Sequence, residues 1–177
     1  NPHDAKGLLK SALRGDDPVF FLESARLLST TGEVPESEYL IPFGQARVVR
    51  QGTDCTIASW GRPVLFCLEA AEELAKVGIS CEVIDLRTVR PLDIGTVVRS
   101  VKRTNACVVV DQSWSFGSPG SELASQVHRH CFDDLDNYVH RVHSADVPTP
   151  YSEPLEQAYL PSARRIVEAV KSATYNL

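Results

Sequence analysis

The sequence contains no methionine, no long hydrophobic run and no excess of positive charge. Because synthesis starts with methionine, a chain beginning at Asn1 is expected to be processed or to be part of a longer protein. No apolar run approaches the roughly 18 residues of a membrane-spanning helix, and the first residues lack the basic and apolar regions of a signal peptide. A net charge of −5 argues against non-specific nucleic-acid binding, which needs a basic surface.

Cysteine pairs with the spacing of a metal or redox site are also missing. The five cysteines stand far apart, their number is odd, and no Cys-x-x-Cys motif occurs. Cys55, Cys81 and Cys107 lie in or beside apolar stretches, where a free cysteine behaves as a small hydrophobic residue. We therefore expect reduced thiols, a reducing compartment and a core that needs no disulfide bond at this chain length.

The N-terminal part of the sequence predicts an incomplete unit. Apolar residues recur at helical spacing over 5–14, Gly15–Pro18 predicts a turn, and the apolar stretch 19–22 predicts a strand. The polar stretch 30–38 has no periodicity and is typical of a linker. One helix cannot cover both faces of a strand. Residues 1–23 are therefore expected to belong to a domain that is mostly absent and to expose the apolar side chains of that strand.

From residue 46 onward, strands and helices alternate. The predicted strands cover residues 46–49, 55–58, 81–84, 106–110 and 139–142, and the predicted helices cover 63–77, 93–103, 119–131 and 162–173. This alternation is typical of a mostly parallel sheet with helices on both faces. The connection 51–54 is too short for a parallel crossover, so the first strand should be antiparallel at an edge or join by a short excursion.

The helices carry recognisable ends and faces. Asp93 is a suitable N-cap for the second helix of this part, and Gly78 is a suitable C-cap for the first. The first helix is expected to bury one stripe of side chains, formed by Val64, Leu65, Leu68, Ala71, Leu74 and Ala75.

The polar motifs favour structural roles. The loop Ser115–Gly120 precedes a helix, whose N-terminus can bind anions. It has only two glycines and no following lysine, so a turn capped by Ser118 or Ser121 is the preferred interpretation. His128 and His130 are two residues apart on a predicted helix and cannot share a metal. The preferred interpretation is a solvated or isolated side chain for Glu69, Glu72, Glu73, Asp133, Asp134, Asp136, His140 and His143. A minority of acidic clusters like that of the three aspartates bind cations or basic partners.

Eight stretches of the chain together resemble one family. They are Asp4–Leu9, Asp17–Glu23, Glu33–Pro35, Gly52–Ile57, Leu68–Leu74, Cys81–Asp93, Ser100–Thr104 and Ala145–Tyr151. The run Ile-Asp-Leu-Arg-Thr-x-x-Pro-x-Asp, residues 84–93, is the most specific. All eight resemble the β subunit of the thiamine-diphosphate-dependent 2-oxoacid dehydrogenase E1 component, in the family's order. Trp114–Glu122 resembles the loop of the pyruvate dehydrogenase type, with one residue more between the glycines, whereas the branched-chain type carries a different loop.

The resemblance implies a division of the chain. Residues 1–23 would be the last helix and strand of a pyrimidine-binding domain, and residues 24–45 would be a linker. Residues 46–177 would form a transketolase C-terminal-like domain, a three-layer α/β/α module. Its mostly parallel five-stranded sheet would have one antiparallel edge strand, in agreement with the pattern of the residues themselves.

The resemblance also implies that the cofactors are held elsewhere. In the family, thiamine diphosphate meets a glutamate in the N-terminal half of the β subunit, and Mg²⁺ is held with the α subunit. No catalytic or cofactor-binding residue is therefore expected here, and the chain alone should be inactive. A structural K⁺ would be bound by the backbone carbonyls of Ala12, Leu13, Gly15 and Asp17. An ordinary helix C-terminus is the alternative interpretation.

The implied partners are proteins of a multienzyme complex. They are the E1 α subunit and a second β subunit in an α₂β₂ assembly, and the peripheral-subunit-binding domain of E2 or of the E3-binding protein. Asp136 and the terminal carboxylate of Leu177 would meet basic residues of that domain. Asn137-Tyr138 and Ser24–Arg26 depart from the family pattern. The implied location is the mitochondrial matrix, or the cytoplasm in a bacterium.

Three alternatives remain beside a pyruvate dehydrogenase E1 β subunit. The chain could be part of a branched-chain 2-oxoacid dehydrogenase E1 β subunit, because substrate choice is set in the absent half. It could also be a non-catalytic interaction module. A free-standing nucleotide-binding domain is disfavoured by the poor glycine loop.

Overall fold

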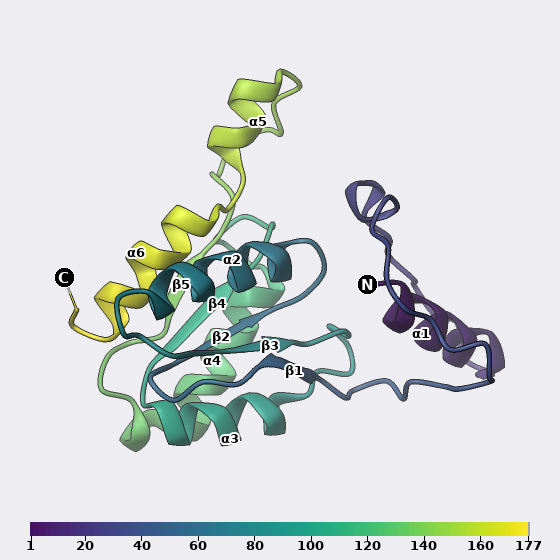
Figure 1. Cartoon of the computed structure of the whole chain (residues 1–177), viewed down its shortest axis with the longest axis horizontal. Coiled ribbons are helices and arrows are strands. Elements are labelled where there is room, and N and C mark those ends of the chain that lie inside the picture. The colour runs from purple at the N-terminus through teal and green to yellow at the C-terminus, as the bar shows by residue number, and fades with distance from the viewer. Residues whose placement is uncertain (177) are drawn as a thin grey trace.

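A five-stranded sheet forms the centre of the molecule. The computed structural model describes residues 1–176, and the strand order is β1-β3-β2-β4-β5 (Figure 1). Strands β2 to β5 are parallel, and β1 pairs antiparallel with β3. This confirms the predicted mostly parallel sheet with one antiparallel edge strand. The strands are β1 (Arg47–Arg50), β2 (Cys55–Ser59), β3 (Cys81–Asp85), β4 (Cys107–Val110) and β5 (His140–Val142).

Two pairs of helices cover the two faces of the sheet (Figure 1). One pair is α2 (Pro63–Ala75) and α6 (Ala163–Ala173), and the other is α3 (Ile94–Thr104) and α4 (Pro119–Cys131). Successive strand residues alternate between the two cores, as expected for a pleated strand. Ile57, Val83 and Val108 pack with α2 and α6, whereas Ala58, Ile84 and Val109 pack with α3 and α4. The result is the predicted three-layer α/β/α module.

The turn between β1 and β2 explains the antiparallel edge. The backbone N–H groups of Thr53 and Asp54 both donate to the carbonyl of Ser80, at 3.0 and 2.8 Å. A Cβ atom on Gly52 would lie 2.1 Å from the carbonyl carbon of Cys81. Only glycine lets the turn pass this close to the start of β3, and the short connection then reverses the chain direction.

The helix ends agree with the sequence, and one helix face differs in part. The Asp93 side chain accepts from the Thr96 N–H at 3.0 Å at the start of α3, as an N-cap does. Helix α2 buries Val64 and Leu74 as expected, but Leu65 is 48% exposed. Ala75 is also exposed, so both residues were wrongly placed in the stripe. Each directly follows a buried stripe residue, and one helical step of about 100° turns it away from the sheet.

All five cysteines are unpaired and buried in the two cores. Burial raises the pKa of the Cys67 and Cys107 thiols to about 12. These thiols therefore stay protonated at neutral pH and act as small core residues.

The N-terminal segment lies beside the sheet domain (Figure 1). It contains α1 (Pro2–Arg14) and the short 3-10 helix η1 (Ala25–Leu27). The strand predicted at 19–22 is wrong, because none of the described residues before Arg47 forms a strand. A strand requires a neighbour to pair with, and this segment has none. Apolar exposure was expected there for Val19, Phe20 and Phe21. Phe20 and Val19 are 95% and 42% exposed, whereas Phe21 is partly buried.

A short helix interrupts the proline-rich stretch before α6. Helix α5 (Glu153–Tyr159) projects from the body of the molecule (Figure 1). The sequence did not predict it, although Pro154 stands in its first turn, where the missing N–H costs no hydrogen bond. Another 3-10 turn, η2 (Phe132–Asp134), follows α4. Among residues 1–176, no helix combines the length and the apolar character that a membrane crossing requires.

Candidate functional site

The predicted K⁺ ligands lie at the C-terminal end of α1. Leu13 is 77% exposed, and Gly15 and Asp17 are exposed. Among the described residues, no backbone N–H after Arg14 donates to the carbonyls of the last turn. Free carbonyls at the negative end of a helix dipole suit a weakly charged hard cation. The donor set therefore fits K⁺ in its chemistry, and the bound ion stays a prediction.

The predicted partner-binding residue Asp136 lies on an anchored, exposed loop. Its backbone N–H donates to the carbonyl of Asn105 at 2.9 Å, and its own carbonyl accepts from the Tyr175 hydroxyl at 2.8 Å. The Asp136 side chain remains at the surface. Tyr175 thus ties the end of α6 to the Asp136 loop. Leu177, the other predicted residue, lies outside the described residues.

The loop after Asp136, where Asn137-Tyr138 departs from the family pattern, is held by its own contacts. Asn137 donates from its side-chain amide to the carbonyl of Ser172 at 3.1 Å and accepts from the Tyr138 N–H at 2.8 Å. The Tyr138 ring stacks on His140, with centroids 4.1 Å apart. His140 is 8% exposed and its Nε2 atom has no hydrogen-bond partner among the described residues. Burial lowers the pKa of His140.

The structure separates the two histidines of α4, as the sequence predicted. The Nδ1 atom of His128 lies 2.9 Å from the carbonyl of Ala124, and its Nε2 atom accepts from the Val139 N–H at 3.2 Å. His130 is exposed. Within residues 1–176, no group of three or more histidine, cysteine or acidic side chains is arranged to hold a metal ion.

The start of α4 is already occupied by protein groups. Ser118 accepts from the Ser121 N–H at 3.1 Å, so Ser118 is the cap. The carboxylate of Asp111 accepts from the Gly120 N–H at 3.0 Å, and burial raises the pKa of Asp111. This internal carboxylate takes the place that a phosphate occupies at an anion-binding helix start. The geometry therefore favours the structural interpretation of the loop over nucleotide binding.

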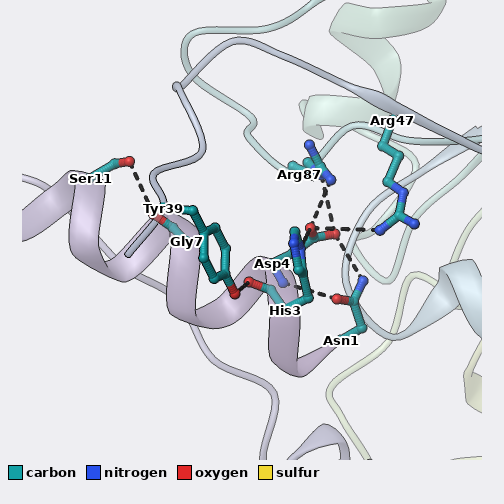
Figure 2. Close-up of polar contacts among 8 residues, drawn as sticks. All are labelled: Asn1, His3, Asp4, Gly7, Ser11, Tyr39, Arg47 and Arg87. Carbon is teal, nitrogen blue, oxygen red and sulfur yellow. Dashed lines mark hydrogen bonds and ion pairs between the residues drawn. The ribbon is translucent and has the colours of Figure 1, made fainter. Parts of the chain in front are cut away.

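Residues 84–93, the signature run, bind the chain that precedes the sheet, and Figure 2 shows the contact of Arg87 with Asp4. The guanidinium of Arg87 donates from two nitrogens to the carboxylate of Asp4, at 2.7 and 3.2 Å. The Thr88 hydroxyl accepts from the Gly44 N–H at 3.0 Å. Asp93, besides capping α3, accepts from the Ala46 N–H at 2.8 Å. The loop after β3 therefore contacts both α1 and the linker.

Asp4 is the most enclosed charge at this junction. It is 4% exposed and receives hydrogen bonds from Arg87 and from the Asn1 side chain, the latter at 2.8 Å. Burial by itself pushes the pKa of Asp4 upward. The hydrogen bonds from His3 and Asn1 and the charge of Arg87 outweigh burial and hold the pKa below its usual value.

No pattern in the sequence predicted this junction. Asp4 and Arg87 both lie in stretches that carry the family resemblance, but neither pattern indicates that they meet. The one feature that could have suggested this contact was an arginine just after a buried strand, together with an aspartate in the first turn of a helix.

Comparison with known proteins identifies the family. Residues 44–166 match the model for the transketolase C-terminal domain. The chain belongs to this family. A solved structure described as a split-gene transketolase, an inactive beta4 tetramer, superposes with a TM-score of 0.65 at 29% identity. It covers 81% of this chain and 46% of that one.

Curated relatives of this transketolase C-terminal domain protein show which larger subunits it resembles. It is 46% identical over 175 residues to the mitochondrial pyruvate dehydrogenase E1 subunit β of Dictyostelium discoideum, covering 97% of this chain and 49% of the relative. It is 44% identical over 170 residues to the β subunit of the acetoin:2,6-dichlorophenolindophenol oxidoreductase of Cupriavidus necator, covering 96% and 50%. The chain thus corresponds to the C-terminal part of an E1 β-like subunit and spans about half the length of these relatives.

Proposed function

We propose that the chain is the C-terminal part of the β subunit of a pyruvate dehydrogenase E1 component. The main support is a sequence identity of 44–46%, over 97% of the chain, to β subunits of that name from Rickettsia felis and Dictyostelium discoideum. The whole complex would oxidatively decarboxylate pyruvate and transfer the acetyl group to lipoyl-E2. The location would be the mitochondrial matrix, or the cytoplasm in a bacterium.

In this proposal the chain supports assembly and docking, not the chemistry. Thiamine diphosphate and Mg²⁺ would supply the decarboxylation chemistry in the upstream half and the α subunit. The start of α4 fits this division, because the carboxylate of Asp111 fills the place where a phosphate would bind. The partners would be the α subunit, a second β subunit, and E2 or the E3-binding protein.

Two sites of this chain belong to the proposal. Asp136, with the terminal carboxylate of Leu177, would bind the basic docking domain of E2. Its anchored backbone and exposed side chain support that role. The carbonyls of Ala12, Leu13, Gly15 and Asp17 would hold K⁺ and neutralise the negative end of α1.

A second candidate is the acetoin-type oxidoreductase, favoured by the 44% identity to that β subunit. The branched-chain type is a further alternative for substrate choice. These three enzymes would share the domain described here and differ in the upstream active site.

A turnover assay of the assembled enzyme separates the candidates. The whole β subunit with its α partner is tested for dye reduction with pyruvate, acetoin and branched-chain 2-oxoacids. We expect kcat/KM for pyruvate to exceed the others by at least about tenfold, a difference of ~1.4 kcal/mol in transition-state binding. The 177-residue chain alone should show no turnover. A preference for acetoin, or dye reduction by the chain alone, would contradict the proposal.

A further inference from the structure

Asp4 of α1 makes two ion pairs with the sheet domain, and the pair with Arg87 is the closer one. The carboxylate of Asp4 lies 3.8 Å from a nitrogen of Arg47 and is bonded through both oxygens to Arg87 (Figure 2). Among the described residues, every hydrogen bond between α1 and the sheet domain runs between Asp4 and Arg87. The arginine side chain is only 12% exposed. A two-pronged, enclosed pair of this kind fixes direction as well as distance.

The backbone aims Arg87 at this partner. Arg87 has φ = 58°, in the left-handed region that residues with a side chain seldom adopt. Its N–H donates to the carboxylate of Asp85 at 3.0 Å, which holds the conformation. An arginine in a right-handed or extended conformation would point elsewhere. The strained conformation is therefore tied to the contact with Asp4.

The same loop binds the chain just before β1 at two more points. Thr88 holds the N–H of Gly44 and itself donates to the carbonyl of Pro91 at 2.8 Å. Asp93 holds the N–H of Ala46. Together these groups fasten the chain immediately before β1, so the linker enters the sheet in one direction.

Contacts within the N-terminal segment hold α1 to the linker. Ser11 donates to the carbonyl of Ile41 at 2.7 Å, and Tyr39 donates to the carbonyl of His3 at 2.8 Å. A Cβ atom on Gly7 would lie 2.6 Å from the Ile41 side chain, so helix and linker pack closely. Helix α1 and residues 39–41 thus pack as one unit, whose orientation on the sheet domain depends on contacts between the two.

We propose that Arg87 and Asp4 form an interdomain clasp that sets the orientation of α1 on the sheet domain. The clasp opens when either charge is removed, and the sheet domain stays folded because its two cores do not include this pair. The signature run 84–93 therefore encodes a joint between domains. That α1 belongs to a larger upstream domain rests on the proposed function, whereas the clasp rests on the contacts of this chain.

Spin labels on α1 and α2 test the clasp in the 177-residue chain. Cysteines replace Leu13 and Glu69, which are both exposed, and the native thiols are buried and do not compete for the label. Electron-electron resonance then measures the distance distribution. Asp4→Asn keeps the shape of the side chain. Arg87→Asn removes the guanidinium, and asparagine tolerates the left-handed backbone.

We expect one narrow distance in the parent chain and a distribution broadened at least about twofold in both variants. Arg50→Gln, which removes an arginine of β1 that is not among the ion-pair partners of Asp4, is the matched control and should stay narrow. The double variant Asp4→Asn with Arg87→Asn should be no broader than either single one, because both remove the same contact.

Denaturation followed by tryptophan fluorescence monitors the sheet domain separately, since Trp60 and Trp114 both lie in it. Its midpoint should not change in the clasp variants. A broad distribution in the parent, or a narrow one in both variants, would overturn the clasp. So would a fall in the fluorescence midpoint alongside the broadening, because the pair would then act through the stability of the sheet domain. Turnover of the whole enzyme plays no part in this readout, so failure of the proposed function would be seen separately.

Discussion

Single residues decide how closely the elements of this domain approach one another. A Cβ atom on Gly120 would lie 2.4 Å from the carboxylate of Asp111, the group that holds the start of α4. Gly52 makes a similar close approach at the start of β3. Both positions require a residue without a side chain, because backbone atoms or an enclosed carboxylate already fill the space where a Cβ atom would lie.

Gly120→Ala should therefore destabilise the domain. The added methyl group must displace the Asp111 carboxylate, and overpacking of this kind costs about 1–3 kcal/mol of unfolding free energy. Urea denaturation followed by tryptophan fluorescence measures the loss. Gly95→Ala is the control: it lies within α3, and its nearest atom is the flexible end of Arg99 at 3.4 Å. A loss in the control as large as that in Gly120→Ala would contradict the explanation.

Whether a short stretch forms a helix or a strand depends most on its neighbours in the structure. The apolar stretch 19–22 has the composition of a strand, but no neighbouring strand is present to pair with it. Helix α5 formed within a stretch whose prolines suggested irregular chain, because a proline in the first helical turn is tolerated. Longer helices with a defined cap, such as α3 and α4, agreed with the pattern. Length and capping thus set how far local sequence determines an element.

The edge strand β5 should make stability depend on pH. Burial lowers the pKa of its His140 below the ordinary value of 6.5. As the pH falls through about 6.5, the unfolded chain takes up the proton first, so the free energy of unfolding decreases. His140→Phe keeps a ring against Tyr138 and removes the titrating group. We expect the melting temperature of the parent to fall more between pH 7.5 and 5.5 than that of the variant.

A matched substitution at the exposed His130 is the control for this measurement. His130→Gln should keep the pH profile of the parent. Parallel profiles for the parent and His140→Phe would show that the buried imidazole is not the source of the dependence.

At the scale of the whole molecule, two surface regions carry the proposed contacts. One is the junction of α1 with the sheet domain at Asp4 and Arg87. The other is the loop of Asp136, which is fastened by Asn105 and Tyr175 and has its carboxylate at the surface. An anchored loop loses little freedom on binding, so a charge presented this way favours recognition of a basic partner.

Asp136→Ala should weaken E2 docking. Losing one rim charge is expected to reduce affinity roughly three- to tenfold, mainly through slower association, and less at high salt. Calorimetric titration of the assembled tetramer with the peripheral-subunit-binding domain measures the change. Glu72→Ala, which removes an equal charge from the exposed face of α2, should leave the affinity unchanged. Equal affinities for Asp136→Ala and the parent would contradict the proposed docking role.

The sequence by itself determined the architecture of the sheet domain. The periodicity of apolar residues placed the strands and helices, the short turn 51–54 excluded a parallel crossover, and Asp93 marked a helix start. These features are local, because each depends on residues within one or two turns of chain. The K⁺ and docking residues came from the family resemblance, and they stay predictions.

Only the tertiary structure decided the features that join distant residues. It brought Arg87 to Asp4, set Asp111 against the start of α4, and left the stretch 19–22 without a partner. A local sequence pattern shows which side chain is present, but it does not show which distant group that side chain contacts. The meeting depends on how the two cores pack and on the direction in which each loop leaves the sheet.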